Sequence, residues 1–95
     1  MMQNNKKYRN KTEIIHDILE TARNDGNGVG KTKLVRNAFL SSYQIGDYLS
    51  ILIDNGLLKY NLDSRRFKIT EKGLNVLRLC NQIGDLIEKE EERRW

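Results

Sequence analysis

Residues 41–73 place the strongest constraint on how this chain can fold. Apolar residues first recur at the spacing of one helix face. They are Ile45, Leu49 and Leu52, with Tyr48 and Ile53 widening the stripe. Asn55-Gly56 then predicts a helix end, because glycine tolerates the left-handed backbone found there. Polar and apolar residues next alternate with period two on both sides of an Asp63-Ser64 turn, which predicts a hairpin over roughly residues 57–69.

Helix signals on both sides of this segment complete the fold. Asn10 and Glu13 form a capping-box pair before an apolar stripe over residues 10–24, and a short helix is expected over 31–38. Glycines between them leave room around Val29 for a very short strand. Ser41 with Gln44 predicts a second capping box, and a final helix over residues 71–95 can be capped by the preceding threonine. The order indicates a mainly α fold with a small β-hairpin.

This order is that of a winged helix-turn-helix followed by an extended C-terminal helix. We expect residues 1–9 to form a flexible basic arm, 10–73 the winged domain, and 71–95 a dimerisation helix. The 95-residue chain is long enough for one small domain. One cysteine excludes a disulfide framework, and no apolar run approaches the length of a membrane span. A soluble, cytoplasmic and nucleoid-associated protein is expected.

Positive charge is concentrated in the predicted winged domain. Residues 1–84 carry 14 Lys/Arg against 8 Asp/Glu, whereas residues 85–95 carry 3 against 5. Cations on the second helix and the hairpin predict contacts with DNA phosphates, which position a duplex without reading its sequence. These residues are Lys31, Lys33, Arg36, Arg65, Arg66 and Lys68.

The third helix would present its N-terminal residues to base edges in the major groove. These residues are Ser42, Tyr43 and Gln44. Gln44 could read adenine, but it could instead be occupied by the cap, and Asp47 on the same face repels phosphate. No arginine there offers the common contact to guanine. Direct base readout and phosphate-dominated, weakly selective binding both remain open.

The sequence GNGVGKT invites a nucleotide-binding interpretation, which its spacing does not support. A Walker A motif needs glycine five positions before Gly30, and that position holds Asp25. A flexible connection is the favoured interpretation of this loop. His16, expected on an exposed helix face, lacks a second metal ligand at suitable spacing, and Cys80 is expected to pack as a small apolar residue. We therefore predict no catalytic site, no metal and no cofactor.

The last helix carries a short heptad-like apolar seam that predicts a homodimer. Its members are Val76, Leu79, Ile83, Leu86 and Ile87. Gly84 lies within this seam and weakens the helix by about 1 kcal/mol relative to alanine.

Four motifs within residues 11–80 support a family resemblance. They are KTEIIHDIL, KTKLVRNAFLS, YLSILIDNGLL and FKITEKGLNVL. Together they resemble archaeal winged helix-turn-helix proteins, and within these the small dimeric chromatin-type DNA-binding proteins. The resemblance implies duplex DNA binding with limited sequence preference and an antiparallel coiled coil through Leu79, Ile83 and Leu86. The alternative is a winged-helix protein-interaction module, which Asp47 and Asp54 on the third helix favour.

Overall fold

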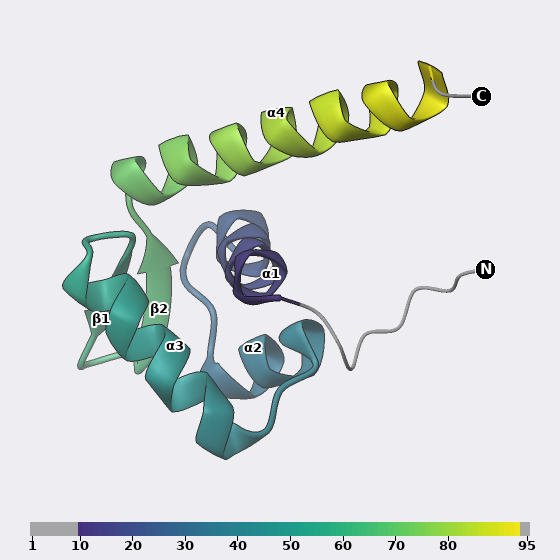
Figure 1. Ribbon diagram of the computed structural model, residues 1–95. Helices are drawn as coiled ribbons and strands as arrows, with labels where there is room; N and C mark the ends of the chain where they lie inside the picture. Colours follow the sequence, from purple (N-terminus) through teal and green to yellow (C-terminus); the bar gives the residue numbers. More distant parts are fainter. Residues whose placement is uncertain (1–9, 94–95) are drawn as a thin grey trace.

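The predicted order of elements is confirmed in the computed structural model, which describes residues 10–93, with side chains described for residues 10–83 (Figure 1). The elements are α1 (Lys11–Asn24), α2 (Lys31–Ala38), α3 (Ser42–Asp54), β1 (Leu58–Asn61), β2 (Arg66–Ile69) and α4 (Glu71–Arg93). The proposed arm over residues 1–9 lies outside the described residues.

Both predicted capping boxes are present. The Asn10 side chain accepts a hydrogen bond from the Glu13 amide at 2.8 Å, and the Glu13 carboxylate accepts one from the Asn10 amide at 3.0 Å. Ser41 and Gln44 make the same reciprocal pair at the start of α3. Each box satisfies two backbone N–H groups that would otherwise lack a partner, so both helices begin where the sequence places them.

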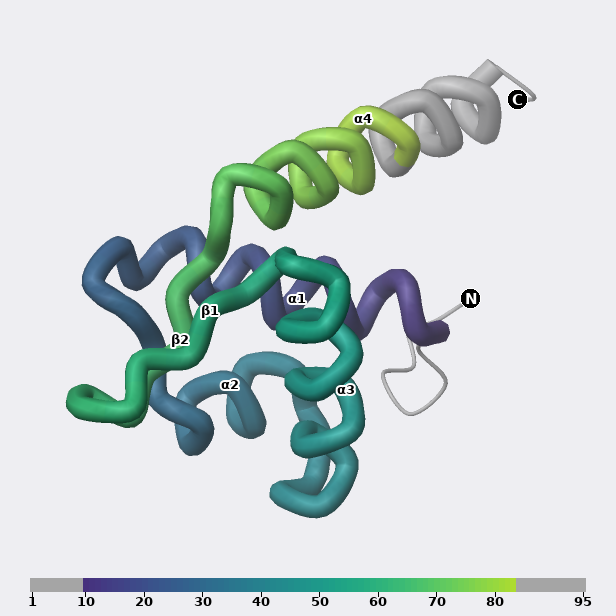
Figure 2. Tube along the Cα trace, turned by 90° about the vertical axis from the view of Figure 1, so that its left-hand side faces the viewer, coloured from purple at the N-terminus to yellow at the C-terminus, as the bar shows by residue number. Residues whose placement is uncertain are grey.

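Helix α1 occupies the centre of the molecule. It packs against α2 on one side and α4 on the other, and α3 lies beside α2 and the hairpin (Figures 1 and 2). The core brings together residues from all these elements. Its fully buried large side chains are Ile18, Leu19, Val29, Leu34, Ile45, Leu52, Leu58 and Leu77.

The apolar stripe of α3 is narrower than predicted. Ile45, Leu49 and Leu52 are buried and Tyr48 is packed against the core, but Ile53 is 36% exposed. Ile53 is the last residue but one of α3 and lines an open hollow beside the hairpin, which leaves its side chain partly exposed.

The loop between α1 and α2 is attached to the hairpin. Val29 and Phe67 exchange two backbone hydrogen bonds of 2.8 Å, which form an isolated bridge at the site of the expected short strand. Gly28 has φ +108°, and a Cβ there would lie 2.9 Å from the Cβ of Arg66. Glycine is therefore required, because another residue would be both strained and too close. The expected short strand at Val29 is thus present as a single bridge, whereas the expectation of a flexible connection is wrong for Gly28.

A threonine joins the end of α3 to the start of α4. The Thr70 hydroxyl donates to the Gly56 carbonyl at 2.6 Å and accepts from the Gly73 amide at 3.0 Å, so it caps α4 as predicted. A Cβ at Gly73 would overlap the carbonyl oxygen of Leu57. These contacts hold the first turn of α4 against the base of the hairpin.

Helix α4 packs against α1 with one face and exposes apolar side chains on another. Leu77 is buried and Val76 packs partly against the same core, whereas Leu79 and Ile83 are 57% and 56% exposed. The helix continues through Gly84 to Arg93. Leu86 and Ile87 lie beyond the residues whose side chains are described.

His16 is less exposed than predicted. This residue of α1 is half-buried on the side that faces α4, and its Nε2 lies 2.8 Å from Oδ1 of Asn81 on α4. The exposed-face prediction failed because α4, which covers this side of α1, is far away in sequence. Among the described residues, no helix is both long enough and apolar enough to cross a membrane.

Candidate nucleic-acid interface

A three-residue turn sets the angle between α2 and α3. Phe39 adopts a left-handed conformation (φ 57°), and the Leu40 amide donates to the Val35 carbonyl at 3.2 Å. Ser41 then caps α3. A left-handed conformation is uncommon for a residue other than glycine. It ends α2 abruptly and brings the beginning of α3 to the surface.

The start of α3 is exposed but carries little charge. Ser42 lies in its first turn, and Tyr43 is 87% exposed. The Gln44 side-chain oxygen accepts from the Ser41 amide at 3.0 Å, so this predicted base contact is partly committed to the cap. Asp47 is exposed one turn later. This end of α3 can offer hydroxyl groups and an aromatic ring to DNA, and a carboxylate that disfavours close approach to phosphate.

The three cations of α2 differ in their surroundings. Lys31 and Arg36 are exposed. Lys33 lies 3.0 Å from a carboxylate oxygen of Asp25 and is half-exposed, so its charge is partly neutralised within the protein. An exposed pair of this kind contributes little to stability and can exchange its partner readily.

The tip of the hairpin has a defined backbone conformation. Oδ1 of Asn61 accepts from the amides of Asp63 and Ser64 at 2.8 and 3.0 Å. The Arg65 amide donates to the Asn61 carbonyl at 2.8 Å, and Arg65 is left-handed (φ 58°). This side-chain turn holds Arg65 at the exposed end of the wing.

The next two predicted cations lie on β2. The Arg66 guanidinium donates to the Gly28 carbonyl at 3.2 Å, which attaches the wing to the α1–α2 loop. Arg66 therefore has a structural contact in addition to its exposed charge. Lys68 is exposed two pairs further along the strand, on the same face as Arg66.

Two exposed wing residues were missed by the sequence reasoning. Lys59 lies directly opposite Lys68 in the strand register, and Leu62 at the tip is 82% exposed. The alternation of β1 already contained the signal for Lys59, because every second residue of a strand faces outward. Within the described residues, no three or more His, Cys, Asp or Glu are placed to hold a metal ion.

These elements and the comparisons define the class of protein. A family model described as winged helix-turn-helix matches residues 8–88, and the chain belongs to this family.

Solved structures with the same fold are similar along most of the chain. The crystal structure of Sso10a-2, a DNA-binding protein from Sulfolobus solfataricus, is 24% identical over 90% of both chains, with a TM-score of 0.77. That of MepR, a transcription regulator of the Staphylococcus aureus multidrug efflux pump MepA, is 15% identical, with a TM-score of 0.74. That match covers 95% of this chain and 69% of the other. No curated protein matches the sequence.

Proposed function

We propose that this protein is a non-enzymatic, homodimeric double-stranded DNA-binding protein with weak sequence selectivity. It would act on the nucleoid, as a chromatin-associated protein or a transcriptional regulator. The observation that carries the proposal is the placement of exposed cations on α2 and the wing, two elements that both pack against α3. Residues 10–73 would form the DNA-binding domain, and 71–95 the dimerisation helix.

In the proposed mechanism, different residues position the DNA duplex and read its bases. The start of α3 would enter the major groove, where Ser42 and Tyr43 face the DNA, while Lys31, Arg36 and Arg65 contact phosphates on either side. Each neutralised phosphate releases counterions and contributes about −0.9 to the slope of log affinity against log salt. The six predicted cations would together give a slope of about −5. Selectivity would be weak because the cations carry most of the affinity.

A salt series tests this proposal. Fluorescence anisotropy would measure the affinity of the full-length protein for several unrelated duplexes of equal length. We expect a steep salt slope and similar affinities for all duplexes. Arg65→Ala should make the slope shallower by about 1, whereas Arg78→Ala on α4 should not. A slope near zero would exclude the phosphate mechanism, and strong preference for one duplex would favour a specific regulator.

The dimer is supported by two apolar side chains that the domain leaves exposed. Leu79 and Ile83 are four residues apart and therefore lie on one face of α4. A second copy would bury them, as part of the seam that continues to Leu86 and Ile87. Sedimentation of the full-length protein should give a dimer, and Leu79→Glu with Ile83→Glu should give a monomer. Wild-type protein that sediments as a monomer would refute this part.

A protein-interaction module is the second candidate. Asp47 and Asp54 are exposed on α3, where acidic groups weaken binding to a polyanion. In this case the wild-type protein would bind no duplex at low salt, and Arg65→Ala would change nothing in that measurement. The anisotropy series above therefore separates the two candidates.

A further inference from the structure

Two lysines lie directly opposite each other on the hairpin. Lys59 of β1 pairs with Lys68 of β2, and both are exposed, whereas the neighbouring Leu58 and Phe67 are buried. Residues directly opposite in an antiparallel pair have Cβ atoms about 5 Å apart, and like charges there destabilise the sheet. The hairpin thus carries a repulsive pair on its outer face.

Nothing on this face neutralises the pair. The other strand residues on the same face are Asn61 and Arg66, which lie opposite each other in the strand register. The ion pairs found among the described residues are His16–Asp17, Arg23–Glu20 and Lys33–Asp25. The outer face of the described hairpin therefore presents three cations and no acid.

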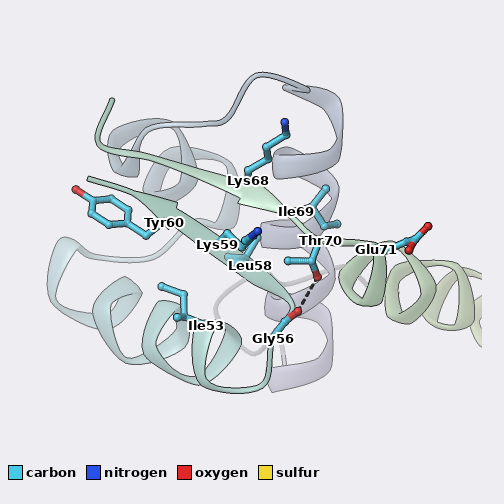
Figure 3. A pocket seen from close by; sticks show the side chains of 9 residues that line it. All are labelled: Ile53, Gly56, Leu58, Lys59, Tyr60, Lys68, Ile69, Thr70 and Glu71. Atoms are coloured by element: carbon cyan, nitrogen blue, oxygen red, sulfur yellow. Dashed lines mark hydrogen bonds between the residues drawn. The ribbon is translucent and has the colours of Figure 1, made fainter. Parts of the chain in front are cut away.

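Both lysines also line one open hollow beside the hairpin, of about 720 Å³ (Figure 3). Ile53 and Tyr60 contribute apolar surface to it, and Glu71 is the one acid among the residues that line it. Both lysine side chains therefore border the same open space.

We propose that Lys59 and Lys68 bracket a phosphate of the DNA backbone on the outer face of the wing. The inference rests on the DNA-binding function proposed above. An anion between the two ammonium groups replaces repulsion with two charge-assisted contacts. A backbone phosphate fits better than a free one, because Arg66 and Arg65 continue the row of cations toward the tip and a polyanion can follow that row. A substitution that reverses the charge of either lysine should therefore stabilise the free protein and weaken its DNA binding.

A charge-reversal cycle tests this opposition. Lys59→Glu and Lys68→Glu each place opposite charges across the strands, so each should raise Tm by about 3 °C. Each should also make the salt slope of DNA binding shallower by about 1. The double variant restores like charges, so its Tm should return toward wild type while its affinity falls further. Lys59→Thr removes one charge and places a residue with high strand propensity in β1. It should also raise Tm and weaken DNA binding, each by less than Lys59→Glu does.

Two further variants serve as controls. Arg78→Glu makes the same change in net charge on α4, and it should weaken DNA binding much less than Lys59→Glu. Glu71→Gln removes the acid that lines the hollow and should tighten DNA binding.

Several outcomes would overturn the bracket. The first is a lower Tm for Lys59→Glu than for the wild type. The second is an equal loss of DNA affinity for Lys59→Glu and Arg78→Glu. The third is that inorganic phosphate at constant ionic strength raises the Tm of the wild type but not of the double variant, while the double variant binds DNA as the wild type does. That result would assign the pair to a free anion. If wild-type protein bound no duplex at all, the proposed function itself would fail, which is a distinct result.

Discussion

The start of α3 and the wing would face the same partner, but they are built differently. The helix start is almost uncharged, and its geometry is set locally, by the Ser41–Gln44 cap. The wing is cationic. Its tip is held locally by the Asn61 turn, but its position on the domain is set over long range, by the contacts of Phe67 with Val29 and of Arg66 with Gly28. In the proposed complex, base reading and phosphate binding would thus fall to separate elements. In such an arrangement affinity can be high while selectivity stays low.

The largest effect is expected from removing two wing charges. Arg65→Ala with Lys68→Ala should make the salt slope shallower by about 2 and weaken binding at 0.1 M salt by about 2.5 kcal/mol. The loss should be equal for all duplexes, because phosphates carry no sequence. Anisotropy with unrelated duplexes measures it, and Arg78→Ala is the control. A loss confined to one sequence would mean that the wing reads bases.

Gly28→Ala tests whether the wing depends on its distant anchor. The positive φ and the close approach to Arg66 should lower the free energy of unfolding by about 2 kcal/mol. Urea denaturation measures this change. Gly26→Ala is the matched control in the same loop, since a Cβ there would meet nothing within 4 Å. Equal stabilities of the two variants would show that the anchor is not needed.

Gln44 allows the cap and the DNA contact to be separated. Gln44→Glu keeps the reciprocal hydrogen bonds, so thermal unfolding should be nearly unchanged, but the added negative charge should weaken DNA binding. Gln44→Ala should lower the free energy of unfolding by about 0.5 kcal/mol and affect DNA binding less. The reverse pattern would indicate that Gln44 reads a base.

Tyr43→Ala should have the smallest effect. The side chain is 87% exposed, so the free energy of unfolding should change by less than about 0.5 kcal/mol. If α3 contributes any base reading, the loss of affinity should differ between duplexes, unlike the uniform loss from the wing. Anisotropy with the same duplexes decides this, and a uniform loss would place Tyr43 against phosphate instead.

The features that the sequence predicted correctly are local ones. Asn10 with Glu13, and Ser41 with Gln44, are three residues apart, so chemistry within one turn determines where these helices begin. The same holds for Thr70 before α4. Hairpin alternation likewise needs only neighbouring residues.

The features that were missed depend on contacts between distant parts of the chain. His16 meets Asn81 65 positions later, and Arg66 reaches Gly28 across 38. No periodicity within one element contains such pairings. For the candidate site the limit is similar. The sequence pattern identified the cations of α2 and the wing, but it did not show that two of them, Lys33 on α2 and Arg66 on the wing, already have partners in the protein.

The single hydroxyl of Thr70 has a consequence for the spacing of DNA sites. It contacts both Gly56, just after α3, and Gly73, in the first turn of α4, so it fixes the direction in which α4 leaves relative to α3. In the proposed dimer, α4 is the only link between the two reading helices. The distance and rotation between the two bound DNA segments would then depend in part on one hydroxyl group at the junction of α3, the hairpin and α4.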